Sequence, residues 1–270
     1  MNFRTAAAMR CESTRLIVDA APRTGAMNMA LDELLLNRSL QSDCAAVRVY
    51  RWSSPTLTLG YFQKQLGDVP QPLRQLDCVR RLSGGGAILH DCELTYSCSL
   101  PAGHPVRSDP SLLYRMVHDP LIELLNSCGA DVCLRRDYQA EQATDQQKTS
   151  QSSAGMGAEP FLCFLRANDN DIVSSSGIKV VGSAQRRRRG AILQHGSIML
   201  KSSTLVPQLP GLQDLFQNFD TQRLQRELPQ VIAAAVAHRS ELSGFTTAEL
   251  AAAEQSLVGS DDASEQTQLT

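Results

Sequence analysis

Apolar and polar residues alternate along several short segments of the chain. Residues 47–52, 56–61 and 93–100 follow this period of two, which is typical of half-buried strands. Residues 178–182 and 191–200 flank a polar turn, and this arrangement predicts a β-hairpin. The sequence therefore predicts strands that often follow one another without a helix between them.

Helical periodicity marks a smaller number of segments. Apolar side chains recur at three- and four-residue steps in residues 27–36 and again in residues 110–128, where Pro120 is expected to kink or split the helix. Three further helical stretches are predicted, near residues 212–219, 229–238 and 247–256. Because these helices are mixed with consecutive strands, the sequence predicts an α+β fold, with a central mixed or mostly antiparallel sheet flanked by helices.

The length of 270 residues suits a single large domain. We expect residues 14–256 to form this domain, with an N-terminal extension at 1–13 and a flexible tail at 257–270. Residues 139–159 are rich in Gln, Ser, Thr and Ala and contain almost no apolar side chain. A disordered loop is therefore predicted at 139–160, inside the domain.

The charges of the chain are nearly balanced. Lys and Arg together number 26 and Asp and Glu 28, so the formal net charge is −2. This balance argues against a protein that binds nucleic acid or a membrane surface over its whole face. The sequence has no run of about 18 apolar residues that could span a membrane, and its first residues lack the apolar stretch of a secretory signal. We expect a cytoplasmic protein with no nucleic-acid partner and no membrane partner.

Cysteines are numerous but show no C-x-x-C spacing. In a chain of this length they are not needed as disulfide staples, so most are expected to be reduced core residues. Cys92 and Cys98 flank one predicted strand and are expected to share its buried face. The eight cysteines are Cys11, Cys44, Cys78, Cys92, Cys98, Cys128, Cys133 and Cys163.

A run of glycines follows two arginines and is a candidate binding loop. Three successive glycines at 84–86 let the backbone approach a ligand and expose consecutive N–H groups. Arg80 and Arg81, directly before them, could hold a phosphate or a carboxylate. The spacing is that of neither a Walker loop nor a Rossmann fingerprint. A plain hairpin turn would also explain the glycines.

Two further residues could carry chemistry. Lys179 lies among apolar residues, and on a strand it would point away from Ile178 and Val180, toward a pocket. There its ammonium could bind an anion, polarise a carbonyl or stabilise a thiolate, although it could equally be a surface lysine on a half-buried strand. Cys163 could be a nucleophile beside such a cation, or a buried structural cysteine.

Taken together, five blocks of the sequence resemble the superfamily of biotin and lipoate protein ligases and lipoyl transferases. The similarity runs from about Leu16 to Leu200. It implies that residues 14–256 are a catalytic domain of this type. The blocks are residues 28–33, residues 51–63, the glycine loop with residues 80–97, residues 177–185 around Lys179, and residues 194–198.

Cys163 decides the branch of the superfamily that the chain resembles. ATP-dependent lipoate ligases activate a free acid with ATP and Mg²⁺ and need no cysteine nucleophile. One transferase branch carries a cysteine ahead of the lysine at about the separation between Cys163 and Lys179. The resemblance to that branch implies transfer of an octanoyl group from octanoyl-acyl carrier protein to a lysine of a lipoyl domain, with no cofactor. The acceptor would be a protein such as glycine cleavage H protein or a 2-oxoacid dehydrogenase E2.

Other functions stay open at this point. The chain could be an ATP-dependent lipoate-protein ligase, or an amidotransferase that moves the acyl group between two lipoyl domains. A catalytically silent module that binds acylated carrier or lipoyl domains is a further alternative. His104, His118 and His238 show no metal-ligand spacing, so no metal site is expected.

The resemblance also assigns roles to residues. Cys163 is the expected nucleophile and Lys179 the cation that stabilises its thiolate, so the two are expected to meet at the mouth of a narrow apolar pocket. N–H groups at Gly86 and Ala87 are expected to stabilise the oxyanion. The residues expected to bind substrate are Arg81 and His90 at the carbonyl end, Ile88 and Leu89 along the acyl channel, and Ser83, Gly84, Gly85, Gly86, Ala87, Gly182, Ser183, Ala184 and His195 around them.

Four consecutive arginines, residues 186–189, stand at the turn of the predicted hairpin. They could dock acidic carrier and lipoyl domains, or contact nucleic acid, or form a solvated hairpin tip. The sequence leaves these three interpretations open.

Overall fold

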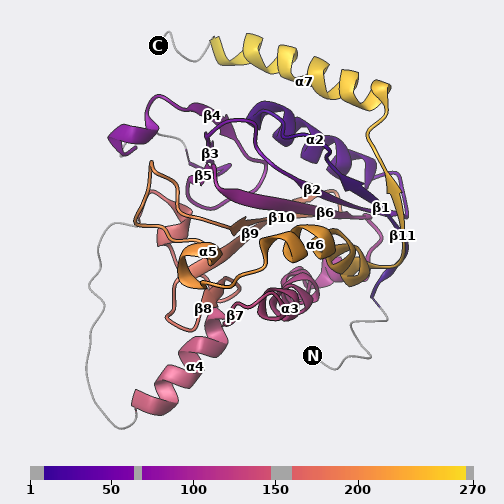
Figure 1. The fold of residues 1–270 in the computed structure, drawn as a ribbon. Helices are drawn as coiled ribbons and strands as arrows, with labels where there is room; N and C mark the ends of the chain where they lie inside the picture. The colour runs from indigo at the N-terminus through magenta and orange to yellow at the C-terminus, as the bar shows by residue number, and fades with distance from the viewer. Residues whose placement is uncertain (1–8, 64–68, 147–159, 266–270) are drawn as a thin grey trace.

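An eight-stranded mixed sheet forms the centre of the computed structural model, which describes residues 9–63, 69–146 and 160–265 (Figure 1). β1 pairs in parallel with both β11 and β2, and the other neighbouring strands are antiparallel. The predicted α+β fold with a mixed, mostly antiparallel sheet is confirmed. In order across the sheet, the strands are β11 (Ala237–Ser243), β1 (Cys11–Val18), β2 (Ala45–Tyr50), β6 (Glu93–Leu100), β10 (Ala191–Met199), β9 (Lys179–Arg188), β8 (Ile172–Ser174) and β7 (Val132–Leu134).

A small three-stranded sheet carries the glycine loop. β3 (Thr56–Leu59) pairs in parallel with β4 (Asp77–Arg80) and antiparallel with β5 (Ile88–His90). The loop connects β4 to β5 and passes so close to the end of β3 that a Cβ at Gly60 would collide with the carbonyl oxygen of Gly85. A short 3₁₀ turn, η1 (Gln71–Leu73), closes the apolar side of this sheet.

Helices cover both faces of the large sheet (Figure 1). α3 (Ser111–Ser127) and α6 (Thr221–Val236) pack on one face and enclose the main core with side chains of β1, β2, β6, β9 and β10. α2 (Gly25–Arg38) and α7 (Thr247–Glu265) lie on the other face, in contact through small clusters around Leu31 and Ala253. Pro120 lies inside α3 without dividing it. None of the helices among the described residues is long and apolar enough to cross a membrane.

The shorter elements complete the course of the chain. η2 (Pro105–Ser108) precedes α3, and α5 (Leu212–Leu215) precedes α6. η3 (Cys163–Leu165) follows the residues at 147–159, which lie outside the described part of the chain.

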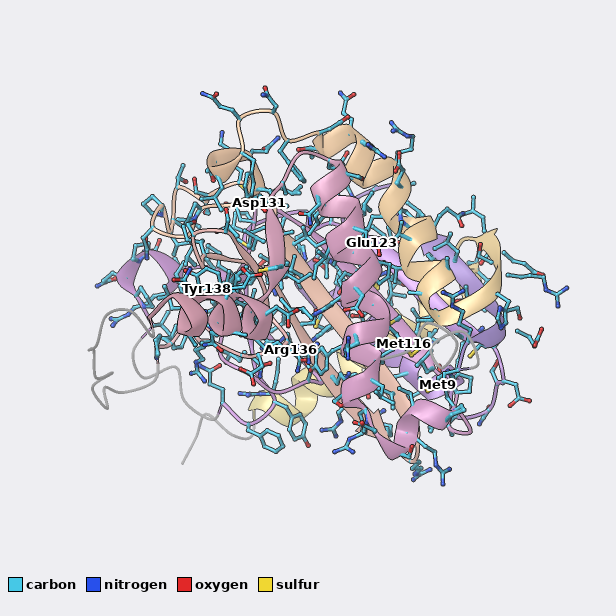
Figure 2. All side chains as sticks on the ribbon, turned by 90° about the horizontal axis from the view of Figure 1, so that it is seen from below. Met9, Met116, Glu123, Asp131, Arg136 and Tyr138 are labelled. Atoms are coloured by element: carbon cyan, nitrogen blue, oxygen red, sulfur yellow. The ribbon has the colours of Figure 1, made fainter. Side chains whose placement is uncertain are left out.

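The segment predicted to be a disordered loop, 139–160, begins as a helix instead. α4 (Arg135–Gln146) extends into it, and Figure 2 shows Arg136 and Tyr138 on this helix. The prediction was wrong for residues 139–146 because Ala, Glu and Gln are good helix formers even without an apolar stripe. Residues 147–159 lie outside the described residues.

Both predicted ends of the domain also differ from the structure. β1 starts at Cys11, inside the expected extension 1–13, and α7 continues to Glu265, beyond the expected start of the tail at 257. β11 was not predicted at all, because every residue of this edge strand except Ala237 is exposed and no apolar alternation marks it. Its backbone pairing with β1 makes it a strand.

The cysteines are all free thiols, but most of them are not core residues. Cys11, Cys98 and Cys128 are buried, whereas Cys78 is exposed and the other four are partly exposed. Cys92 lies just before β6 and is only partly buried, so it does not share the buried position of Cys98. The expectation of mostly core cysteines was wrong because several of them stand at the ends of strands.

Candidate active site

A cavity of about 360 Å³ lies where the small sheet meets β9, β10 and η3. Its wall combines apolar and aromatic side chains, such as Met29, Trp52 and Tyr114, with polar groups. All of the predicted site residues except Ser83, Ala87 and Leu89 line it. They are Arg81, Gly84, Gly85, Gly86, Ile88, His90, Cys163, Lys179, Gly182, Ser183, Ala184 and His195.

Cys163 and Lys179 meet in this cavity. The ammonium nitrogen of Lys179 lies 3.8 Å from the sulfur of Cys163 and donates a hydrogen bond of 3.2 Å to the carbonyl oxygen of the same residue. Cys163 opens η3 and Lys179 opens β9, so the two come from separate elements. The expected convergence of the thiol and the ammonium is therefore present.

Local packing explains how each of the two side chains is held. The N–H of Cys163 donates to the carbonyl oxygen of Ala87 at 2.7 Å, and this contact ties η3 to the glycine loop. On β9, a Cβ at Gly182 would stand 2.7 Å from Cε of Lys179, so only glycine leaves room for the lysine stem. Gly85 has a φ of +96°, a left-handed conformation that favours glycine. A Cβ there would lie 3.8 Å from the sulfur of Cys163.

Asp171, which the sequence analysis missed, is the counter-charge of Lys179. Its Oδ2 lies 3.0 Å from the ammonium nitrogen, and the two side chains are 4% and 6% exposed. The same oxygen accepts a hydrogen bond of 2.8 Å from the N–H of Asn168. Burial raises the pKa of Asp171, although Lys179 acts in the opposite direction. The only signal in the sequence was indirect, since a buried lysine needs a carboxylate partner.

Arg81 holds the glycine loop in place. Its guanidinium donates to the backbone and side-chain oxygens of Thr58, and to the carbonyl oxygens of Gly84 and Gly86 at 3.1 and 2.8 Å. Burial lowers the pKa of Arg81 to about 10, while the nearby Cys163 and Glu93 oppose this shift. The expected contact of Arg81 with a substrate carbonyl competes with these loop contacts, so its observed role is to shape the loop.

Three predicted residues do not line the cavity. In β5, Ile88 and His90 face the cavity, whereas Leu89 lies on the opposite side and packs in the apolar cluster of the small sheet with Ala87. The N–H of Ala87, which we expected to stabilise an oxyanion, donates to the carbonyl oxygen of Phe161 at 3.1 Å and is already engaged. Ser83 is buried and contacts Nε2 of His195 at 2.5 Å.

His90 lines the cavity, and both of its ring nitrogens have hydrogen-bond partners. Its Nδ1 lies 2.7 Å from Glu93 and its Nε2 lies 2.7 Å from the hydroxyl of Thr58. The imidazole stacks on Trp52, with ring centres 3.8 Å apart. Burial lowers the pKa of His90, although Glu93 opposes this shift. Because both ring nitrogens already form hydrogen bonds, neither is available to contact a substrate carbonyl.

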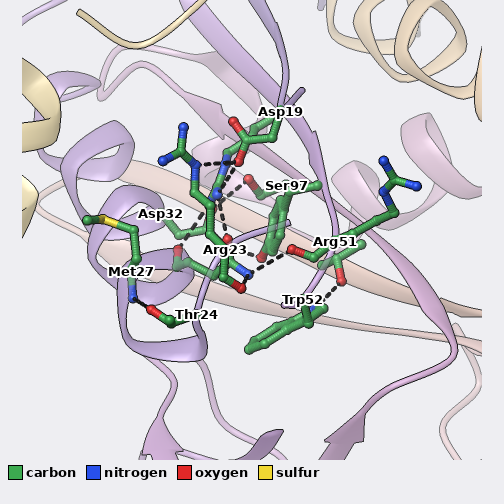
Figure 3. Close-up of polar contacts among 12 residues, drawn as sticks. Asp19, Arg23, Thr24, Met27, Asp32, Arg51, Trp52 and Ser97 are labelled. Carbon is green, nitrogen blue, oxygen red and sulfur yellow. Dashed lines mark hydrogen bonds and ion pairs between the residues drawn. The ribbon is translucent and has the colours of Figure 1, made fainter. Parts of the chain in front are cut away.

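A second buried carboxylate, Asp32 on α2, anchors the opposite wall. It accepts hydrogen bonds of 2.9 Å from Tyr50 and from Ser97 and forms an ion pair of 3.2 Å with Arg48. Nδ1 of His195 lies 3.6 Å away, which links Asp32 to the cavity lining. Burial opposes ionisation of Asp32, but His195 and Arg48 outweigh it and the pKa is lowered. Figure 3 shows Asp32 and Ser97 in this network.

The side chains of the four arginines at 186–189 have different surroundings. Arg186 stacks on the ring of Tyr61 at 4.4 Å, and Arg188 forms an ion pair of 2.8 Å with Glu33. Arg187 and Arg189 are exposed. Among the described residues, no group of three or more His, Cys, Asp or Glu side chains is placed to hold a metal ion.

The family of the chain follows from comparison with known proteins. The model of the family described as "Lipoyl protein ligase A/B catalytic domain" matches residues 24–257. This match covers most of the sequence, so the chain belongs to the lipoyl protein ligase A/B catalytic domain family. The resemblance seen in the sequence is confirmed.

Two relatives that the chain resembles are octanoyltransferases. The chain is 35% identical to octanoyltransferase LipM of Halalkalibacterium halodurans over 216 residues, which are 78% of this chain and 72% of that protein. It is 34% identical to octanoyltransferase LipM of Bacillus anthracis over 226 residues, which are 82% of this chain and 76% of that protein.

Solved structures agree in fold. Lipoate-protein ligase A bound with ATP has a TM-score of 0.64 at 17% identity, covering 91% of this chain and 94% of the other. A bipartite lipoate protein ligase of Thermoplasma acidophilum, described with its E2 lipoyl domain, has a TM-score of 0.60 at 18% identity and covers 92% of each chain. At these identities the likeness establishes the fold alone.

Proposed function

We propose that the chain transfers an octanoyl group from octanoyl-acyl carrier protein to a lysine of a lipoyl domain, through a thioester on Cys163. The chain is an octanoyltransferase of protein lipoylation, as its relatives at 34–35% identity support. The observation that carries the proposed route is the distance of 3.8 Å between the ammonium of Lys179 and the sulfur of Cys163.

The reaction has two halves. In the first, the thiolate of Cys163 attacks the thioester of the donor, and the donor thiol leaves. In the second, the amine of the acceptor lysine attacks the thioester on Cys163 and forms an amide. Because the donor is already an activated acyl group, this route needs neither ATP nor another cofactor. The ammonium of Lys179 stabilises the thiolate by its charge.

The cavity supplies space and donors for this chemistry. Its volume of about 360 Å³ falls within the range of roughly 300–1,000 Å³ that small-molecule sites occupy. Ile88 and Met29 offer apolar contacts to an acyl chain, while the loop Gly84–Gly85–Gly86 brings backbone close to the sulfur. The N–H groups of this loop, other than the engaged one of Ala87, are the donors that we assign to the oxyanion.

The partners follow from the reaction. The donor is acyl carrier protein, and the acceptor is a lipoyl domain such as that of glycine cleavage H protein or a 2-oxoacid dehydrogenase E2. A structural neighbour is described together with its E2 lipoyl domain, which supports an acceptor of this class. The free thiols favour a reducing, cytoplasmic location.

An ATP-dependent ligase is the second candidate, because the fold is shared with a lipoate-protein ligase bound to ATP. Such an enzyme would release pyrophosphate when free lipoate and ATP are supplied, and it would not depend on Cys163. An amidotransferase between two lipoyl domains would use the same cysteine, but its donor would be an acylated lipoyl domain.

The test is incubation with octanoyl-acyl carrier protein in the absence of ATP, followed by intact-mass measurement of the enzyme and of an added lipoyl domain. We expect an octanoyl adduct on the wild-type enzyme and product on the acceptor. Cys163→Ser should form neither thioester nor product, whereas Cys133→Ser, a partly exposed cysteine on β7, should behave as wild type. Product from Cys163→Ser at the wild-type rate, or a requirement for ATP, would overturn the proposal.

A further inference from the structure

The ammonium of Lys179 contacts two acidic groups, and the proposed route uses only one of them. One contact is the sulfur of Cys163 at 3.8 Å, and the other is Oδ2 of Asp171 at 3.0 Å. Asp171 lines the same cavity and is only 3% exposed. The thiol, the ammonium and the carboxylate therefore form a continuous row in which Lys179 stands in the middle.

Backbone N–H groups also hold Asp171 in place, in addition to Lys179. The N–H of Asn168 donates to Oδ2 at 2.8 Å, and the N–H of Arg135 donates to the carbonyl oxygen of Asp171 at 2.8 Å. These contacts hold the carboxylate against Lys179 at a place where burial disfavours its charged form. A carboxylate in such a place accepts a proton more readily than one in water.

The proposed reaction leaves one proton without an assigned acceptor. The first half exchanges one thioester for another, so the thiolate of Cys163 is consumed, the donor thiolate is released, and no proton moves. In the second half, the attacking amine must lose a proton to become an amide nitrogen. A group that takes up this proton is needed in the second half alone.

We infer that Asp171 is a positioning residue for the second half, which takes up this proton through Lys179. The inference rests on the proposed function. The C–N bond forms, the C–S bond breaks and its electron pair stays on the sulfur as a thiolate. Lys179 passes one proton to the carboxylate of Asp171 and receives one from the amine, so it ends as an ammonium. Amine, thioester and carboxylate become amide, thiolate and carboxylic acid, and the charges balance.

The other ionisable groups around the row do not compete for this role. Tyr114 and His118 approach from α3, Arg135 from α4 and Arg81 from the glycine loop. Burial raises the pKa of Tyr114 to about 12 and lowers that of His118 to about 4. Neither changes its charge near neutral pH, and Arg81, whose pKa is lowered only to about 10, stays protonated there.

One substitution, Asp171→Asn, should affect the unloading of Cys163 without affecting its loading. Asp171→Asn keeps the size of the side chain but removes the proton acceptor, so loading of Cys163 should continue and unloading should fail. It also removes a negative charge beside Lys179, so the ammonium acts more fully on the sulfur. Alkylation of Cys163 by iodoacetamide, which requires the thiolate, should then begin at lower pH.

The experiment measures both halves on each variant. The enzyme is mixed with octanoyl-acyl carrier protein, the adduct on Cys163 is followed by intact mass, and an apo lipoyl domain is then added to follow its loss. We expect Asp171→Asn to load at least as fast as wild type and to unload about 100-fold more slowly. Asp171→Glu should recover part of the unloading rate. Asp169→Asn, an exposed carboxylate two residues away, should match wild type in both halves.

The possible results are distinct. Equal slowing of both halves, with alkylation moved to higher pH, would mean that Asp171 only holds Lys179 in place and would overturn the inference. Unloading of Asp171→Asn at the wild-type rate would overturn it too. No adduct on the wild-type enzyme would overturn the proposed function and this inference with it, whereas a wild-type adduct without accumulation in the variant overturns the inference alone.

Discussion

At the scale of single residues, Lys179 combines requirements that rarely occur together. Its side chain is buried, yet it must carry a charge next to a sulfur. A buried charge is costly unless it is paired, and Asp171 provides the pairing at 3.0 Å. Gly182 provides the space for the stem. A surface lysine would need neither of these neighbours.

Replacing Lys179 tests its effect on the thiol. In Lys179→Gln the sulfur of Cys163 loses its cation and faces a cavity that still contains Asp171. We expect iodoacetamide to alkylate Cys163 about tenfold more slowly at neutral pH, since a nearby cation favours the thiolate by at least this factor, and acyl transfer to fall further. Lys201→Gln, an exposed lysine, is the control. An unchanged alkylation rate would contradict the assignment of Lys179.

A second residue-scale prediction concerns the space at Gly182. In Gly182→Ala the new methyl group would stand 2.7 Å from Cε of Lys179 and displace the ammonium from the sulfur. Overpacking of this kind costs about 1–3 kcal/mol. We expect a drop of at least tenfold in transfer rate with a modest loss of thermal stability. Kinetics and a thermal melt check this, and a fully active variant would show that the lysine can adjust.

The sequence could supply some of these residues and not others. Lys179 and the glycine loop are recognisable because they belong to contiguous blocks, and Cys163 is recognisable by its separation from Lys179. Asp171 lies outside these blocks, and nothing in the block 28–33 shows that Asp32 has a role; only the folded chain places the two carboxylates beside Lys179 and His195. The error at Ala87 and Leu89 has the same origin, since a loop motif does not reveal which face of β5 meets the cavity.

At the scale of elements, α7 is held by one buried carboxylate. Glu249 forms ion pairs with Arg15 of β1 and with Arg38 of α2, the latter at 2.7 Å. Hydrogen bonds from Arg15 lower the pKa of Glu249 from 4.5 to about 2. Since the pKa is depressed in the folded protein, the pairing stabilises fully above about pH 4.5, and this contribution is lost as the pH falls toward 2.

Glu249→Gln should therefore lower stability in a pH-dependent way. We expect the thermal midpoint of the variant to lie several degrees below that of wild type near neutral pH, and the difference to shrink as the pH falls from 4.5 toward 2. Glu254→Gln, an exposed residue on α7, is the matched control. A difference that stays constant over this pH range would rule out the ionised pairing as the cause.

The elements that were predicted correctly are those with an apolar period. α2, α3 and the β9–β10 hairpin bury many apolar side chains and therefore leave a pattern in the sequence. α4 and β11 bury little, so their formation depends on helix propensity in one case and on backbone pairing in the other. Hydrophobic patterns cannot report elements that have almost no hydrophobic face.

At the scale of the whole molecule, the two ends of the described chain meet in the sheet. β11 pairs in parallel with β1, with Cys11 opposite Ala237 and Ile17 opposite Ser243. α7 then packs on α2. The large sheet is therefore completed only by residues that are far apart in sequence, which explains why its order could not be read from the local patterns.

Truncation after Val236 tests this closure. The shortened chain loses β11 and α7, leaves the edge of β1 unpaired and uncovers part of α2. We expect a thermal midpoint lower by roughly 5 °C or more and a tendency to self-associate through the open edge. Circular dichroism melts and size-exclusion chromatography measure both effects. Leu242→Ser, an exposed position on β11, should change neither, and a monomeric truncated chain of full stability would contradict the prediction.

The pairing of β1 with β11 also sets an order of events on the ribosome. β1 is synthesised before its outer partner, which starts at residue 237, so this edge stays unpaired until all the residues between them have been made. Contacts between such distant residues form slowly, and an exposed edge is a site of association between nascent chains. That risk ends only when β11 emerges and pairs with β1.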